Sequence, residues 1–121
     1  MFKKLKALFG GRNQEPRFGI LRDEQDGQNG RSLSANIEDG NIVIRGLDWG
    51  SEVERFWGQR EYEWIWTIPA TQIPKLLQAL NRQDDPIAGL QEQFSNENAS
   101  LLSDFLDVHD IQCDKWSRLG D

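Results

Sequence analysis

The chain has 121 residues, of which 37% are hydrophobic and 28% are charged, so it is long enough for one domain with its own core. Its mean hydropathy of −0.68, and the absence of an apolar run of about 18 residues, exclude a membrane-spanning helix. The net charge is −6, and because residues 1–12 carry +4, the rest of the chain carries −10. Such an acidic body disfavours nucleic acid and favours a basic protein partner, unless its acidity serves only solubility.

Residues 1–12 differ in charge from the single domain expected over residues 13–121. In MFKKLKALFGG, apolar residues recur at helical spacing and two glycines follow; they are Phe2, Leu5, Leu8 and Phe9. We expect a basic amphipathic helix or tail, too short in its apolar part for a secretory signal. Two roles stay open. The segment frays or caps the domain, or it touches anionic lipid through Lys3, Lys4 and Lys6 as a membrane-proximal adaptor anchored by residues 1–11.

Residues 13–69 predict β-structure. RFGILRD, residues 17–23, is the first expected strand, and the glycine-rich EQDGQNGR that follows is a turn or loop. SLSANIE and NIVIRGL, residues 32–38 and 41–47, alternate in polarity and are joined by Asp39-Gly40. Because this pair accepts positive φ at both turn positions, it predicts a hairpin with a fixed register.

The fourth expected strand is REYEWIWTIP, residues 60–69, reached through a loop with one helical turn around Glu52 to Phe56. One face of it carries Tyr62, Trp64, Trp66 and Ile68, and the other carries Glu61, Glu63, Ile65 and Thr67. Since a large aromatic side chain buries about 150–250 Å², we expect the aromatic face to join the core. Trp49 and Trp57, among charged neighbours on the preceding loop, are then better candidates for exposed contact residues.

The second half changes to helical periodicity. Helices are expected over residues 71–82, over 84–94 with Asp85 as N-cap and Pro86 in the first turn, and over 98–109 with Asn98 as cap. IQCDKWS, residues 111–117, alternates again and can return as a last edge strand. The order predicts an α+β fold, with an antiparallel sheet of about four strands in the first half, then about three helices.

Residues suited to catalysis or metal binding are scarce. His109 is the only histidine, and Cys113 lies four residues on, past the expected end of its helix. Together they supply two of the four ligands of a structural zinc site, and an EF-hand loop centred on Gly27 would place Arg22 where a carboxylate is required. We therefore expect no metal, no cofactor and no enzymatic activity, with a small enzyme using His109 and a nearby carboxylate as the alternative. The lone cysteine precludes an internal disulfide and fits a reducing cytoplasm.

Two groups of carboxylates are candidates for binding a cationic partner. One is Asp104, Asp107 and Asp110, spaced every third residue of the last expected helix, with Asp114 beyond it. The other is Glu52, Glu54, Glu61 and Glu63. Carboxylates steer and pair with cations, and Trp49 or Trp57 would anchor the centre of the interface.

The segments EYEWIWTIP, IPKLLQAL and FLDVHDIQCDKWS together resemble small acidic bacterial proteins, and their organisation is similar to that of immunity proteins of polymorphic or contact-dependent toxin systems. The likeness covers about residues 40–118 and is one of composition and layout, so it transfers no site residue. It implies a cytoplasmic protein that occludes a cognate toxin domain. The acidic body independently suits a basic toxin.

Overall fold

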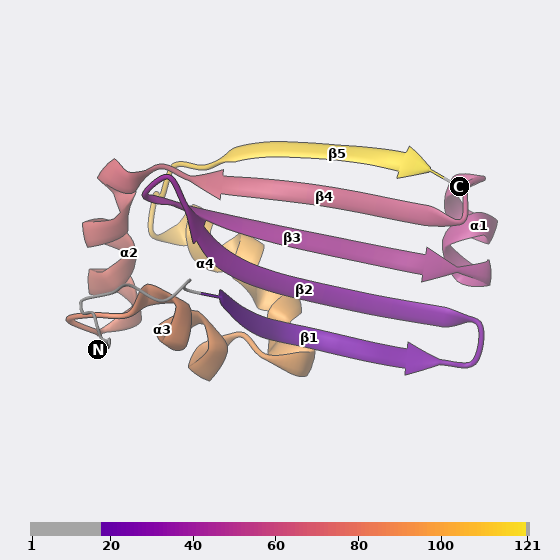
Figure 1. Cartoon of the computed structure of the whole chain (residues 1–121), viewed down its shortest axis with the longest axis horizontal. Helices are drawn as coiled ribbons and strands as arrows, with labels where there is room; N and C mark the ends of the chain where they lie inside the picture. The colour runs from indigo at the N-terminus through magenta and orange to yellow at the C-terminus, as the bar shows by residue number, and fades with distance from the viewer. Residues whose placement is uncertain (1–17, 121) are drawn as a thin grey trace, which may run out of the picture.

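A computed structural model describes residues 18–120 and shows an α+β fold built on one five-stranded antiparallel sheet. The strands are β1 (Phe18–Asp26), β2 (Asn29–Glu38), β3 (Asn41–Gly50), β4 (Glu61–Ile68) and β5 (Asp114–Gly120), and they lie side by side in that order (Figure 1). The first four strands form a meander, whereas β5 returns to the edge of β4 after the helices. The basic helix expected over residues 1–12 lies outside the described residues.

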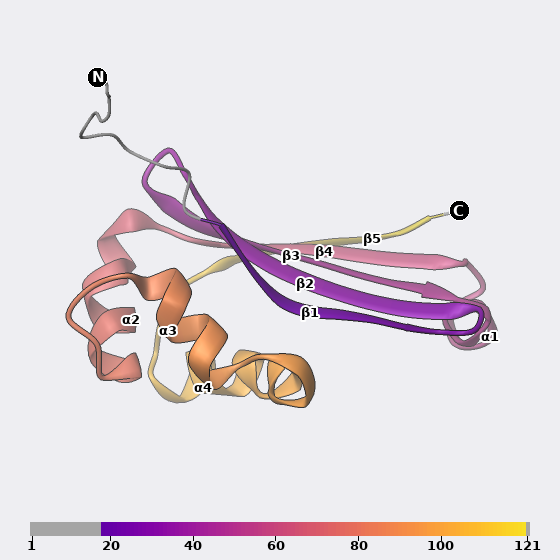
Figure 2. The ribbon, with the colours of Figure 1, turned by 60° about the horizontal axis from the view of Figure 1, so that its bottom comes forward.

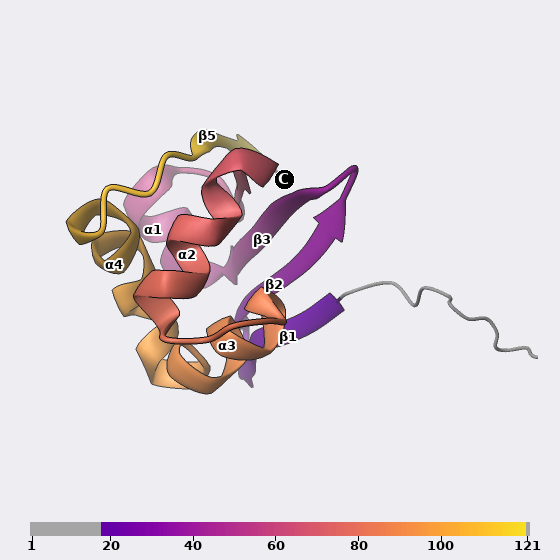
Figure 3. The ribbon, with the colours of Figure 1, turned by 90° about the vertical axis from the view of Figure 1, so that its left-hand side faces the viewer.

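The helices occupy one side of this sheet. They are α1 (Ser51–Trp57), α2 (Ile73–Leu80), α3 (Pro86–Gln93) and α4 (Leu102–Val108), with 3-10 turns at Ala70–Gln72 and Asn96–Leu101. Figure 2 shows α2, α3 and α4 together beneath one end of the sheet and α1 at the opposite end. Figure 3, viewed from the first end, shows α2, α3 and α4 on one side of the strands. Within residues 18–120, no helix is long and apolar enough to cross a membrane.

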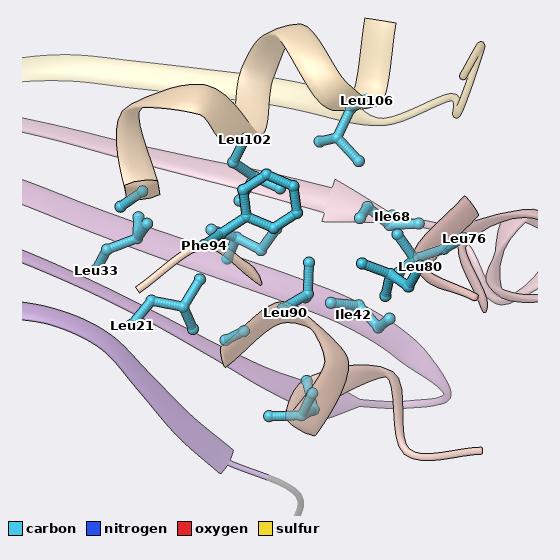
Figure 4. Close-up of a cluster of buried hydrophobic side chains, with 14 of the residues drawn as sticks. Leu21, Leu33, Ile42, Ile68, Leu76, Leu80, Leu90, Phe94, Leu102 and Leu106 are labelled. Carbon is cyan, nitrogen blue, oxygen red and sulfur yellow. The ribbon is translucent and has the colours of Figure 1, made fainter. Parts of the chain in front are cut away.

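The core lies where α2, α3 and α4 cover the sheet (Figure 4). Aliphatic side chains from both layers meet there with 2% exposure or less, among them Leu21, Ile42, Ile44, Ile68, Leu76, Leu80, Leu90, Leu102 and Leu106. Each fully buried Leu or Ile contributes about 1.5–3 kcal/mol relative to an exposed one. The helices are only seven or eight residues long, so packing rather than intrinsic helix propensity stabilises them.

Two local predictions are confirmed. Asp39 and Gly40 both have positive φ, 53° and 83°, and they turn β2 into β3 as the Asp-Gly pair requires. Asp85 caps α3, because its carboxylate accepts a hydrogen bond of 3.1 Å from the Ala88 N–H, and Pro86 occupies the first turn.

The second half differs from expectation in two places. The last segment does return as an edge strand beside β4, which gives the sheet five strands, but this strand begins at Asp114 rather than at residue 111. Asn98 does not cap a helix, because it lies within the 3-10 turn that leads directly into α4. The Leu102 N–H donates to the Ala99 carbonyl, so the preceding turn satisfies a helix-start donor that a side chain would otherwise have to satisfy.

Candidate functional site

Side chains that point away from α2, α3 and α4 form what we call the open face of the sheet. The strand register aligns one row across all five strands: Ile20, Ser34, Arg45, Ile65 and Trp116. The adjacent rows add Phe18, Asn36, Val43, Thr67 and Asp114 on one side, and Asp23, Ser32, Leu47, Glu63 and Arg118 on the other. Successive residues of a strand point to opposite faces, so this surface lies on the side that the helices leave uncovered.

Large apolar side chains of the open face are exposed. Phe18 is 59% exposed, Ile20 52% and Trp116 49%, while Leu47 and Ile65 are half-buried in the central strands. Val43, flanked by Asn36 and Thr67 on its neighbouring strands, is buried. These apolar side chains form two groups, Phe18 with Ile20 on β1 and Ile65 with Trp116 on β4 and β5, and Ser34 and Arg45 lie between them. Exposed apolar groups of this kind are typical of interaction sites.

Two ion pairs lie within the open face. Arg45 binds both carboxylate oxygens of Glu38, with Nη2 3.2 Å from Oε1, and Asn36 donates a further hydrogen bond of 2.8 Å to the same carboxylate. These donors hold the pKa of Glu38 below its ordinary value, and the pairing raises the pKa of Arg45. Arg118 Nε lies 3.0 Å from Glu63 Oε1 across the β4–β5 pair. Both cations that residues 18–120 place on this face are therefore already paired.

Three further carboxylates of the open face lack such a partner. Asp23, Glu61 and Asp114 form no ion pair with any residue in the described part of the chain. The face thus combines apolar side chains on both sides of the Arg45–Glu38 pair with negative charge that is still available to an incoming cation.

Trp49 belongs to the open face as well. A Cβ added to Gly30 would lie 2.2 Å from the indole ring of Trp49, which shows that this ring lies flat over Gly30 of the neighbouring strand. Glycine at position 30 therefore allows the Trp49 ring to approach the backbone of β2 closely. The indole is half-buried there, at one end of the sheet. The register places Trp49 directly beside Glu61, with Glu63 two residues further along β4. Asp114, another residue that the sequence suggested for partner binding, shares this face but lies at the opposite end of β4, across from Thr67.

The candidates on and beside α1 lie elsewhere. Glu52 and Glu54 are exposed on this helix at the end of the sheet, and Glu54 lies 3.4 Å from Arg60. Trp57 is 58% exposed, but its ring stacks on Tyr62 with centroids 5.6 Å apart and planes 12° apart. Trp57 therefore extends the aromatic row of the helix-side face and does not join Trp49.

The aspartate series of the last helix is interrupted. Only Asp104 and Asp107 lie on α4, which ends at Val108, so the prediction of one continuous acidic helix face is wrong. Asp110 has a left-handed φ of 56°, and the chain turns back there as the Ile111 N–H donates to the Leu106 carbonyl. The Asp110 carboxylate lies 3.9 Å from Lys75 Nζ.

Within residues 18–120, no hydrogen bond or ion pair joins the His109 side chain to Cys113 or to a carboxylate. His109 is exposed at the end of α4, with its ring 4.5 Å from that of Phe105. Burial raises the pKa of the Cys113 thiol, and nearby Lys115 only partly offsets this, so the thiol stays protonated at neutral pH. Among residues 18–120, no three His, Cys, Asp or Glu side chains gather as metal ligands would.

The aromatic row of β4 is less buried than expected. Ile68 is fully buried, but Tyr62, Trp64 and Trp66 are only half-buried, because the helices cover just one end of the sheet. Successive ring centroids of the row lie 5.5 and 6.4 Å apart. These rings line a shallow groove of about 490 Å³, together with the Arg31–Asp48 ion pair and Lys115, whose Nζ lies 5.0 Å from the Trp66 centroid.

Sequence reasoning missed the open-face residues Ile20, Ile65 and Trp116 as a group. The alternation in β4 had already placed Ile65 beside Glu63, but only the strand register shows that Trp116 comes to lie next to it. No family model, no curated protein and no solved structure matches the chain. The case for function therefore depends on this surface.

Proposed function

We propose that this protein is a protein-binding module whose open face receives a basic surface of a partner. Its most concrete form is a cytoplasmic immunity protein that occludes a cognate toxin domain. One observation carries the proposal: Ile65 and Trp116, adjacent apolar side chains on β4 and β5, share a face with carboxylates that have no cationic partner among the described residues. Apolar side chains at the centre of an interface supply affinity when water is excluded, and charges around them select the partner.

The mechanism is obstruction. A partner whose lysines or arginines surround its own active site would pair with Asp23, Glu61 and Asp114, and its substrate could then no longer enter. The net charge of −6 raises the association rate for such a partner, with a strong dependence on ionic strength. Occlusion uses no group of this chain as a nucleophile, base or metal ligand.

The test is affinity capture from extract of the source cell with three forms of the full chain: wild type, Trp116→Ala/Ile65→Asp, and Leu101→Asp. Leu101 is 55% exposed at the start of α4, so it is a matched control for an apolar-to-acid change at an exposed site away from the open face. A basic protein retained by wild type and control, and lost with the double variant, supports the proposal. The purified partner should then bind Trp116→Ala at least about tenfold more weakly than wild type.

A captured protein that binds the double variant as tightly as wild type would show that the open face is not the binding surface. The immunity function has its own test, which is expression of the captured partner in a host cell with and without this protein. Rescue of growth by wild type, and not by the double variant, is the expected result. A partner that is harmless when expressed alone contradicts the immunity function and leaves the binding module intact.

A further inference from the structure

A smaller hollow adjoins the aromatic groove of about 490 Å³ on the helix-side face. This inner pocket has a volume of about 110 Å³, and its walls come from the sheet and from the segment that leads into α4. The side chains that line both hollows are Trp64, Trp66, Arg31 and Asp48. Because the two hollows share a wall, one ligand can extend from the inner pocket into the aromatic groove.

Arg22 lines the inner pocket with unused hydrogen-bonding capacity. Its side chain is only 13% exposed, and Glu24 Oε2 lies 3.0 Å from its Nε without the geometry of a hydrogen bond. The guanidinium donates no hydrogen bond to any residue within 18–120. Buried donors in native proteins are nearly always satisfied by protein, water or a ligand, and the planar fork of arginine matches a carboxylate. Arg22 therefore indicates an acceptor that the described part of the chain does not supply.

Other donors surround the same space. Trp64 Nε1 is buried and has no acceptor among the described residues. Lys115 Nζ lies 3.5 Å from Ser103 Oγ, a hydroxyl of the inner pocket, while the lysine itself lines the aromatic groove. The Lys115 ammonium is thus at the junction of the two hollows, and it forms no ion pair with residues 18–120.

The charge of this site is opposite to that of the chain as a whole. The cations are Arg22, Arg31 and Lys115, and the carboxylates in contact with them are Glu24 and Asp48. Three cations against two carboxylates leave an excess of positive charge in a chain whose net charge is −6. A local excess of this kind favours an anionic ligand.

The aromatic groove suits a planar apolar body. Tyr62, Trp64 and Trp66 are half-buried there and leave part of their rings open to the groove. Aromatic rings stack in offset or tilted arrangements with centroids about 4.5–7 Å apart, so the groove can accept a further ring. Its volume of about 490 Å³ lies within the range of small-molecule sites.

We propose that the two hollows together bind a small aromatic carboxylate. Its carboxylate enters the inner pocket against Arg22, with the Lys115 ammonium beside it, and its ring lies in the aromatic groove on Trp66. This binding site goes beyond the proposed function, because it is on the helix side of the sheet and uses none of the open-face carboxylates.

The test is a titration of the ¹⁵N-labelled full chain with indole-3-acetate, followed through its indole N–H signals. Indole-3-acetamide is the control probe, since it has the same shape and no charge. We expect the signals of Trp64 and Trp66 to shift, with a Kd for the acid at least about tenfold lower than for the amide. Trp49 is the reference that should not move, because Trp116 borders the aromatic groove as well as the open face.

Two variants assign the carboxylate to its partners. Arg22→Met keeps an apolar stem and removes the donors, so it should weaken binding of indole-3-acetate at least about tenfold. Lys115→Met should weaken it about threefold, and because Lys115 is exposed this variant keeps the test decisive if Arg22→Met fails to fold. Arg60→Met and Lys75→Met remove cations that line neither hollow, and they should bind as wild type does.

Three results would overturn the site. Unmoved Trp64 and Trp66 signals at about 10 mM indole-3-acetate would mean that only water satisfies Arg22. Equal Kd values for the acid and the amide would show an apolar groove with no site for an anion. Equal losses in Lys115→Met and Lys75→Met would assign the effect to overall charge. Each of these results leaves the open face and its protein partner untouched, because capture of that partner is measured without the probe.

Discussion

The two faces of the sheet carry similar apolar residues, but these residues are buried on one face and partly exposed on the other. On β4, Ile68 is fully buried on the helix side, whereas Ile65, three residues earlier, lies half-buried on the open face. The difference comes from the second half of the chain, whose amphipathic helices pack on one side only. Burial here is decided by which surface receives a helix layer, and less by the residue type on the strand. We therefore expect substitutions on the helix-side face to change stability and those on the open face to change binding.

The largest effect should follow from Leu102→Ala. Leu102 is fully buried between α4 and the sheet, and its truncation leaves a cavity worth about 2–5 kcal/mol in the free energy of unfolding. Its neighbour Leu101 is 55% exposed, so Leu101→Ala is the matched control, with an expected change within about 0.5 kcal/mol. Urea denaturation of each variant measures the change in its free energy of unfolding. Equal losses in the two variants would show that α4 does not close the core.

A second comparison uses the two glycines that lie beneath tryptophans on opposite faces. In Gly46→Ala the new Cβ would lie 2.2 Å from the Trp64 ring, which is packed against the core, so we expect a loss of about 1–3 kcal/mol. In Gly30→Ala the new Cβ is equally close to Trp49, but this ring can move toward solvent on the open face. Thermal unfolding should rank Gly46→Ala as the less stable variant. The reverse order would mean that Trp49 is the more firmly held of the two rings.

A smaller effect on stability is expected from Ile65→Thr, which keeps β-branching in the strand and removes apolar area from the centre of the open face. Threonine is favoured in strands, so the free energy of unfolding should change by no more than about 1 kcal/mol. Binding of the captured partner should weaken severalfold in isothermal titration. If Ile65→Thr lost more stability than Gly46→Ala, the expectation that open-face residues serve binding more than stability would be contradicted.

The smallest effect concerns the ion pair of the open face and its dependence on pH. Because Arg45 and Asn36 hold the pKa of Glu38 below 4.5, the carboxylate stabilises the folded state above that pH, and this contribution is lost as pH falls through the lowered pKa. Glu38→Gln should thus be slightly less stable than wild type at pH 7. The gap should close below pH 4.5 in paired denaturation curves. A gap that persists in acid would assign the effect to the amide substitution itself.

The sequence predicted features that depend on a few adjacent residues. Asp39-Gly40 and Asp85-Pro86 carry their conformation in their own chemistry, and the structure confirms both. The sorting of Tyr62, Trp64, Trp66 and Ile68 to one face followed from simple alternation, and the register confirms that as well.

Features that depend on distant parts of the chain were out of reach. How far the helices extend over the sheet depends on their short lengths and on the turns between them, so the half-burial of Trp64 and Trp66 was not foreseeable. The stacking of Trp57 on Tyr62 requires Gly58, whose φ of 82° turns the chain back toward β4. The open face emerges only when Trp116, from the last strand, is set beside Ile65.

Because β5 is the last strand of the sheet to be synthesised, its position in the chain affects cotranslational folding. Strands β1 to β4 emerge as consecutive hairpins that can zip together early, but β5 pairs with β4 only after all the helices have been synthesised. Until then the nascent meander presents the unpaired edge of its most tryptophan-rich strand to every neighbouring polypeptide. The seven-residue strand β5 therefore protects the edge of β4 from pairing with other chains. A chain that is truncated before Asp114 should be prone to aggregate.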